Sequence, residues 1–144
     1  MTTTYKLAIG PDDLTKCHDA LHMWGMPHAE RHMDHPCLMA FRDNRLVGFI
    51  STAPLDEAKA VVCNRIAVDP ELTKMSKAFL VIRMVEGYER VLKGAGMKWY
   101  HVSLDSTNQH FIKLIERAFD SKPYAEVERE GSAFKTVWFK REIA

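Results

Sequence analysis

The chain has 144 residues, of which 47% are hydrophobic and 27% are charged, and its formal net charge is +1. This composition is ordinary for a soluble globular protein, and a domain of this length buries about 68–70% of its unfolded surface without metals or disulfides. We therefore expect one domain over residues 1–144. The small net charge argues against binding to nucleic acid or to an anionic membrane, and no apolar run is long enough to cross a bilayer.

The cysteines and the first residues indicate a cytoplasmic protein. Cys17, Cys37 and Cys63 are odd in number and lack CxxC spacing, which is typical of reduced thiols. The start of the chain, Met1–Thr4, is polar and does not resemble a signal peptide.

The apolar pattern predicts alternating strands and helices. A strand over Tyr5–Ile9 precedes a helix that Asp12 or Asp13 caps and that reaches Trp24, and a polar loop or short helix covers His28–Pro36. The later predicted elements are strands Cys37–Phe41 and Leu46–Thr52, a loop Pro54–Lys59, a strand Ala60–Val68, a helix from Thr73 or Ser76 to Lys93, a strand Trp99–Leu104, a helix Asn108–Phe119, and a hairpin of Tyr124–Arg129 with Ala133–Lys140. One strand–helix–strand crossover in a mixed order indicates an α/β fold whose sheet carries helices on both faces.

A charged elbow joins the strand ending at Val68 to the long helix. A turn that leads into a helix N-terminus beside a strand end can hold an anionic cofactor, because free N–H groups and the positive end of the helix dipole favour phosphate. Lys74 and Lys77 add positive charge there. Equally, Thr73 or Ser76 caps the helix and the lysines are solvated. Both interpretations stay open on the residues alone.

The stretch from Val68 to Phe119 resembles the coenzyme A site of the GNAT superfamily of acyl-CoA N-acyltransferases. Members carry Val-x-Pro and then Arg or Gln-x-x-Gly-x-Gly or Ala; here Val68-Asp69-Pro70 matches, and Thr73, Ser76 and Ala78 occupy the later positions. The resemblance implies a mostly antiparallel central sheet, acetyl-CoA as co-substrate and no metal. The residues that it implies for cofactor binding are Ile66, Val68, Thr73, Lys74, Met75, Ser76, Lys77, Ala78 and Asn108.

The second matching motif begins after the fifth predicted strand. GNAT proteins often place an Asn there, followed by a helix that ends in Leu-Tyr-x-x-x-Gly-Phe, and this chain has Asn108, Leu114 and Ala118-Phe119. Ile115 stands where the family often has a Tyr that protonates the departing thiolate, and its side chain cannot donate a proton. Tyr124 or a water is the candidate substitute. Asn108 is also a good helix N-cap, so both roles are open.

His101 is the candidate general base. Strand alternation places Trp99, His101, Ser103 and Asp105 on one face, and Asp105 lies about 13 Å from His101 along an extended strand, too far for a direct dyad. Such a polar face is more often simply solvated. The resemblance implies an amine acceptor, either a small molecule or a peptide, and leaves its identity and the oligomeric state open.

The His28–Pro36 segment invites a metal hypothesis. It holds His28, Glu30, His32, Asp34 and His35, and on a helix His28 and His32 would share a face. Because prolines bracket a short segment, we interpret it as a polar loop on the substrate side and expect no metal.

An inactive protein is the alternative to an enzyme. The Lys-rich helix start, the Trp-Tyr strand and the Asn-x-x-Phe-Ile-Lys-x-Ile helix, from Lys74 to Phe119, are also similar to short GNAT-like proteins of tailed bacteriophages. Some of those are internal components of the virion, which implies an interaction or structural role with a protein partner in place of catalysis.

Overall fold

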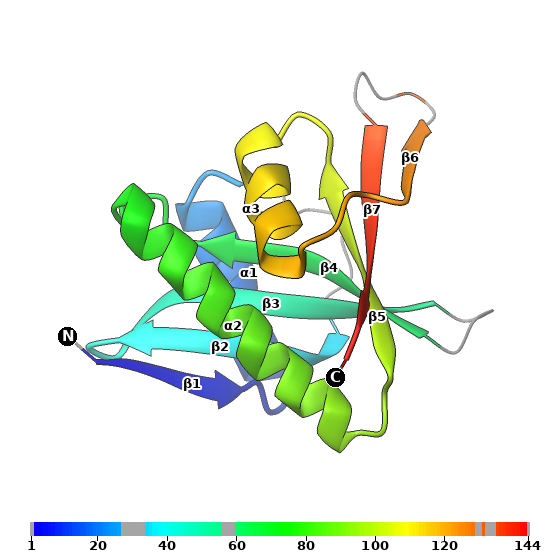
Figure 1. Ribbon diagram of the computed structural model, residues 1–144. Coiled ribbons are helices and arrows are strands. Elements are labelled where there is room, and N and C mark those ends of the chain that lie inside the picture. Colours follow the sequence, from blue (N-terminus) through cyan, green and yellow to red (C-terminus); the bar gives the residue numbers. More distant parts are fainter. Residues whose placement is uncertain (1, 27–33, 56–59, 129–130, 132–134, 144) are drawn as a thin grey trace.

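The computed structural model describes residues 2–26, 34–55, 60–128, 131 and 135–143. Within these residues a seven-stranded sheet has the order β1-β2-β3-β4-β5-β7-β6 and is accompanied by three helices (Figure 1). In chain order the elements are β1 (Thr3–Leu7), α1 (Pro11–Met23), β2 (Asp34–Arg42), β3 (Arg45–Leu55), β4 (Ala60–Val68), α2 (Lys74–Gly94), β5 (Trp99–Asp105), α3 (Gln109–Phe119), β6 (Ala125–Glu128) and β7 (Lys135–Glu142).

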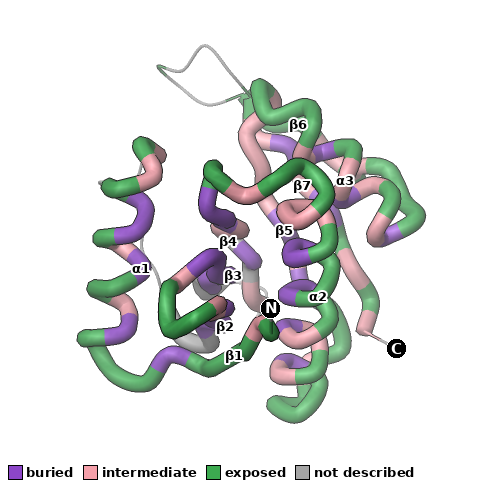
Figure 2. Tube along the Cα trace, turned by 90° about the vertical axis from the view of Figure 1, so that its left-hand side faces the viewer, coloured by how far each residue is buried: buried purple, intermediate pink, exposed green. Residues whose placement is uncertain are grey.

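The sheet is antiparallel except at its centre. Only the β4–β5 pair is parallel among the described strands, and α2 makes the crossover between them. Helix α1 lies on one face of the sheet, and α2 and α3 lie on the other (Figure 2). The predicted order, the mostly antiparallel sheet and the helices on both faces are therefore confirmed.

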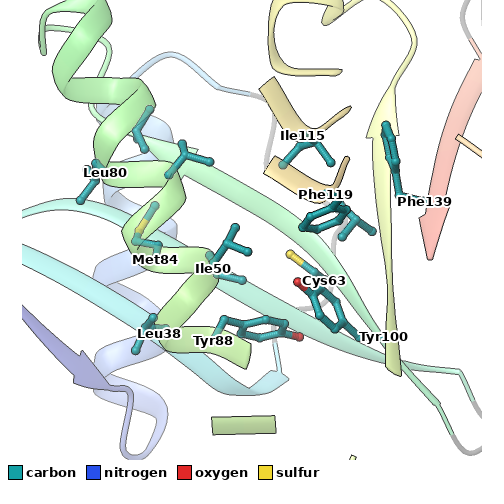
Figure 3. Close-up of a cluster of buried hydrophobic side chains, with 14 of the residues drawn as sticks. Leu38, Ile50, Cys63, Leu80, Met84, Tyr88, Tyr100, Ile115, Phe119 and Phe139 are labelled. Carbon is teal, nitrogen blue, oxygen red and sulfur yellow. The ribbon is translucent and has the colours of Figure 1, made fainter. Parts of the chain in front are cut away.

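Two hydrophobic cores hold the layers together. The larger one packs α2 and α3 on the sheet and includes Met84, Tyr88 and Phe119 (Figure 3). The smaller one lies under α1, where Cys17 and Leu21 meet residues of β2, β3 and β4. Cys17, Cys37 and Cys63 are all buried and free, as expected of structural thiols.

The start of α1 corrects a prediction. Gly10, at φ 80°, is the N-cap and Pro11 occupies the first helical position, whereas a cap at Asp12 or Asp13 was expected. Proline suits that position because its φ is fixed near the helical value and its missing N–H has no partner to lose. The buried Asp13 carboxylate instead accepts the backbone N–H of Ile9 at 2.8 Å and pairs with Lys6 at 3.2 Å.

Several strand ends also differ from the prediction. Asp34–Pro36 belong to β2 and Pro54–Leu55 to β3, although both segments were predicted as loop. β1 begins and ends two residues earlier than expected, and β7 runs on to Glu142. Residues 27–33 and 56–59, the remainder of the two predicted loops, lie outside the described residues.

Candidate functional site

The two parallel strands at the centre of the sheet part after a short contact. β4 and β5 pair at Val62–His101 and Cys63–Val102, and no further pair joins them in the described chain, although β4 runs on to Val68. The register with β3 skips Asn64 at this point, because Ser51 pairs with Arg65 but Thr52 pairs with Cys63. This β-bulge bends β4 away from β5 (Figure 1).

The parted strands leave one edge of β4 without a strand partner. The Asp69 N–H donates to the Val47 carbonyl at 2.8 Å, which fixes the phase of the antiparallel ladder with β3. Because hydrogen-bonded and non-hydrogen-bonded pairs alternate, Ala67 bonds toward β3, whereas the N–H and C=O groups of Ile66 and Val68 point to the open side. Two of the predicted cofactor-binding residues thus present backbone donors and acceptors to the gap.

The elbow after β4 is held rigidly. Asp69 is buried, its Oδ1 accepts the Glu71 N–H at 2.9 Å, and its Oδ2 lies 3.5 Å from the Arg45 guanidinium. Thr73 is the N-cap of α2, and its Oγ1 accepts the Ser76 N–H at 3.2 Å. The capping role foreseen for Thr73 is confirmed. The N–H groups of Lys74 and Met75, the first two helical residues, have no acceptor within the helix.

A cleft of about 410 Å³ lies between the first turns of α2 and the outer face of α3. Its walls carry three predicted cofactor-binding residues, Lys74, Met75 and Ala78. The other wall is formed by four residues of α3, namely His110, Lys113, Leu114 and Arg117. No carboxylate is among these lining residues, so the cleft is electropositive.

Sequence reasoning found one wall of this cleft and missed the other. His110, Lys113 and Arg117 recur at spacings of three and four, which places them on one face of α3. That spacing was the available signal, but it also fits a solvated helix face. Ser76 and Lys77 are half-buried in the first turn of α2 and do not line the cleft.

The residues of the second motif cap helix α3 and pack it on the core. Asn108 is the N-cap of α3, and its Oδ1 accepts the Phe111 N–H at 3.4 Å. Ile115 stands at the position where the family often has a proton-donating Tyr. It is fully buried beside Phe119 and Cys63 in the larger core (Figure 3). Asn108 does not line the cleft, so its part in cofactor binding stays a prediction.

His101 and Tyr124 meet on the opposite face of the sheet from α3. Tyr100 and Val102 are buried under the helices, so His101 and Ser103 point the other way, as predicted. The Nδ1 atom of His101 is hydrogen-bonded to the Tyr124 hydroxyl at 2.9 Å. The chain therefore brings together the two candidate catalytic side chains, which come from β5 and from the segment before β6.

Both side chains of this pair titrate away from their ordinary values. Burial lowers the pKa of His101, and the Lys140 ammonium lowers it further. Burial also raises the pKa of Tyr124. At neutral pH the imidazole is thus neutral and the phenol keeps its proton, which are the states that a proton acceptor and a proton donor need. Cys63 is different: burial raises its pKa and makes the thiolate scarce, so it is an inert core thiol.

The described residues contain no group of three or more His, Cys, Asp or Glu side chains placed to hold a metal. Most of the predicted cluster, including His28, Glu30 and His32, lies outside them, and Asp34 and His35 begin β2. None of the helices in the described ranges is long and apolar enough to span a membrane.

Solved structures of the same architecture include acetyltransferases. The ribosomal-protein-S18-alanine N-acetyltransferase of Escherichia coli has a TM-score of 0.75 at 15% identity, covering 99% of this chain and 95% of that one. An N-acetyltransferase of Staphylococcus aureus has a TM-score of 0.73 at 10% identity with full coverage of both chains, 100% each. yncA from Salmonella typhimurium, solved with its cofactor acetyl-CoA, has a TM-score of 0.72 at 12% identity over 100% and 95% of the two chains. At these identities the likeness shows the fold.

A match to a protein-family model shows the family to which the sequence belongs. The model of the acetyltransferase (GNAT) family matches residues 4–120, which is most of the chain and includes β1 through α3. The chain belongs to this family. No curated protein matches the sequence significantly.

Proposed function

We propose that this protein transfers the acetyl group of acetyl-CoA to a primary amine. The observation that carries the proposal is the convergence of three features at one end of the parted strands: the open edge of β4, the N-terminus of α2, and the electropositive cleft between α2 and α3. Each suits a different part of a long, polyanionic thioester.

The cleft residues fit the phosphates. Lys74, Lys113 and Arg117 supply three cations without a competing carboxylate on the cleft wall, and the Lys74 and Met75 N–H groups stand at the positive end of α2. Thr73 fixes this end by capping it, and Ser76, Lys77 and Ala78 complete the first turn. The small side chains of Ser76 and Ala78 let a phosphate approach the backbone closely, though less freely than glycine would.

The open edge of β4 fits the arm of coenzyme A that carries two amide groups. Its two amides can pair with the backbone groups of Ile66 and Val68 in the way that a strand would, because those groups face the gap. Such pairing directs the thioester toward the point where β4 and β5 meet, beside His101. Asn108, at the head of α3, is the remaining residue that we assign to this site.

His101 and Tyr124 supply the proton transfers. With the proton on Nδ1, His101 donates to the Tyr124 oxygen, and its Nε2 lone pair accepts the proton that the amine loses as it attacks the carbonyl carbon. The carbon–sulfur bond breaks, and the departing thiolate takes the hydroxyl proton of Tyr124. Positioning provides most of the remaining acceleration. Tyr124 thus does the work that Ile115, buried in the core, cannot do.

Calorimetric titration with acetyl-CoA and coenzyme A, followed by an amine screen for thiol release, tests the proposal. Micromolar binding with turnover supports it, and His101→Ala should then lower turnover by about 10²- to 10⁴-fold with unchanged coenzyme affinity. Full activity of His101→Ala would remove His101 from the mechanism.

A second candidate function is that of a non-catalytic interaction protein. Two observations favour it: Ile115 is fully buried, and the Ser76 N–H is already satisfied by Thr73. In that case no coenzyme binding appears even at millimolar ligand, and the protein binds a protein partner instead.

A further inference from the structure

Aromatic side chains gather around His101 on the part of the α1 face that α1 itself leaves open. Helix α1 packs on β2, β3 and β4, whereas Tyr124 and Trp99 are 55% and 46% exposed. The His101 ring stands edge-on to Tyr124 at 5.8 Å and to Trp138 of β7 at 6.5 Å between centroids. Exposed rings grouped beside polar atoms commonly mark a binding site, because a soluble protein seldom leaves such rings in water without use.

Hydrogen bonds and strand pairing bring His101, Tyr124 and Trp138 together. The Tyr124 N–H donates to the Trp138 carbonyl at 2.9 Å, and the Tyr124 hydroxyl bonds to His101. Ser103 of β5 pairs directly with Trp138, and Ala125 of β6 pairs with it on the other side. The sheet therefore presents the rings next to one another, and the bond between His101 and Tyr124 lowers the cost of ordering these two when a ligand packs on them.

The charge near His101 is positive. Lys140 lies directly across from His101 on β7, and its ammonium stands 4.4 Å from the centre of the Trp99 ring. Asp105, on the same face at the far end of β5, has its Oδ1 occupied by the N–H and hydroxyl of Thr107 at 3.0 and 2.9 Å. Lys140 faces His101 directly, whereas Glu142, opposite Trp99 on the same face, lies one pair further along the strands, so a polycationic acceptor meets a positive charge at the proposed base itself.

We infer that the acceptor is a primary amine that carries an aromatic ring, with its nitrogen at His101 and its ring on Trp138 and Tyr124. The inference rests on the proposed function, since it places the acceptor at the proposed base. Aromatic pairs prefer edge-to-face and offset geometry and contribute beyond the area that they bury. The side chains on this face supply such partners for a ring within reach of the His101 imidazole.

A series of three acceptors, two of them ring compounds of similar size, tests the inference on the unmodified protein. Initial rates at saturating acetyl-CoA are compared for 2-phenylethylamine, 2-cyclohexylethylamine and spermidine. We expect kcat/KM for the phenyl compound to exceed that for the cyclohexyl compound roughly three- to ten-fold, which corresponds to one or two aromatic contacts, and spermidine to be the poorest. Equal rates for the two ring compounds, or a preference for spermidine, overturn the inference.

Variants at two tryptophans, Trp138 and Trp24, locate the preference. Trp138→Leu should abolish it and Trp138→Phe should retain most of it, while Trp24→Phe, a matched change beside Phe49 under α1, leaves it unaltered. An undiminished preference in Trp138→Leu contradicts the assignment. Should Trp138→Leu fail to fold, the wild-type acceptor series still decides.

A binding measurement separates this inference from the proposed function. Calorimetry with 2-phenylethylamine, with and without coenzyme A, reports on the aromatic surface without turnover. If coenzyme A does not bind, while the arylamine binds and Trp138→Leu abolishes arylamine binding, the transferase proposal alone is refuted. Coenzyme binding and turnover of other amines, without arylamine binding, refutes the acceptor inference alone.

Discussion

Removing the two cations of α3 should weaken coenzyme A binding measurably. Lys113 and Arg117 line the cleft opposite Lys74, and both are exposed, so each resembles a solvated ion pair worth about 0.2–1 kcal/mol with a phosphate. Together the two contribute about 0.5–2 kcal/mol. The double variant Lys113→Ala/Arg117→Ala should therefore raise the dissociation constant of coenzyme A roughly 2- to 30-fold.

Salt provides the decisive control for this prediction. Calorimetry at about 0.1 M and about 1 M salt spans Debye lengths of about 10 and 3 Å, so the difference between wild type and variant should shrink as salt rises. Arg90→Ala/Lys93→Ala makes the same change of charge on exposed residues at the far end of α2 and should have little effect. An equal loss in both double variants, or a loss that salt does not reduce, would refute the cleft as the phosphate site.

Three further changes test the site and its support. Burial and a neighbouring ammonium lower the pKa of His101. When referred to the unprotonated amine, kcat/KM should therefore be flat at neutral pH and fall only as pH drops below about 6.5, where the imidazole gains a proton; His101→Ala should lack this limb in a pH–rate profile. Ser76→Trp should abolish coenzyme binding by filling the approach to the first turn of α2, and calorimetry showing unchanged affinity would reject that approach route. Gly48→Ala should destabilise the fold by about 1–3 kcal/mol in chemical denaturation, because a Cβ would lie 3.0 Å from the Ala67 carbonyl oxygen and 3.2 Å from the Met84 side chain; an unchanged midpoint would show that β3 and α2 yield there.

Local sequence signals predicted the elements well and failed at two prolines. Pro36 was interpreted as the end of a loop, yet it lies in β2 where the register with β3 shifts between Asp34 and Leu38. Pro54 pairs with Val61 of β4, and the β2–β3 pairs among the described residues end at Thr52. Proline is tolerated in strands at irregularities and edges, and neither condition can be read from neighbouring residues.

In the candidate site too, features set by neighbouring residues were predicted, and contacts between residues far apart in the sequence were not. Thr73 and Asn108 are helix caps that a short motif predicts, and the structure confirms both. The hydrogen bond between His101 and Tyr124 joins residues 23 positions apart, and it exists because β7 lies between β5 and β6. Sequence reasoning named each side chain as a catalytic candidate but had no means of pairing them.

The bulge at Asn64 separates the curvature of β4 from the packing of the core. Before it, Cys63 points into the core under α2 and α3; after it, Ile66 and Val68 do so, although an uninterrupted strand would turn residues of even number to the opposite face. Deletion of Asn64 would leave Ile66 and Val68 two and four positions after Cys63, on the same face as now, and would remove the bulge that bends β4 away from β5. The loss of this one codon would thus spare the core and take away the gap that the proposed coenzyme edge needs.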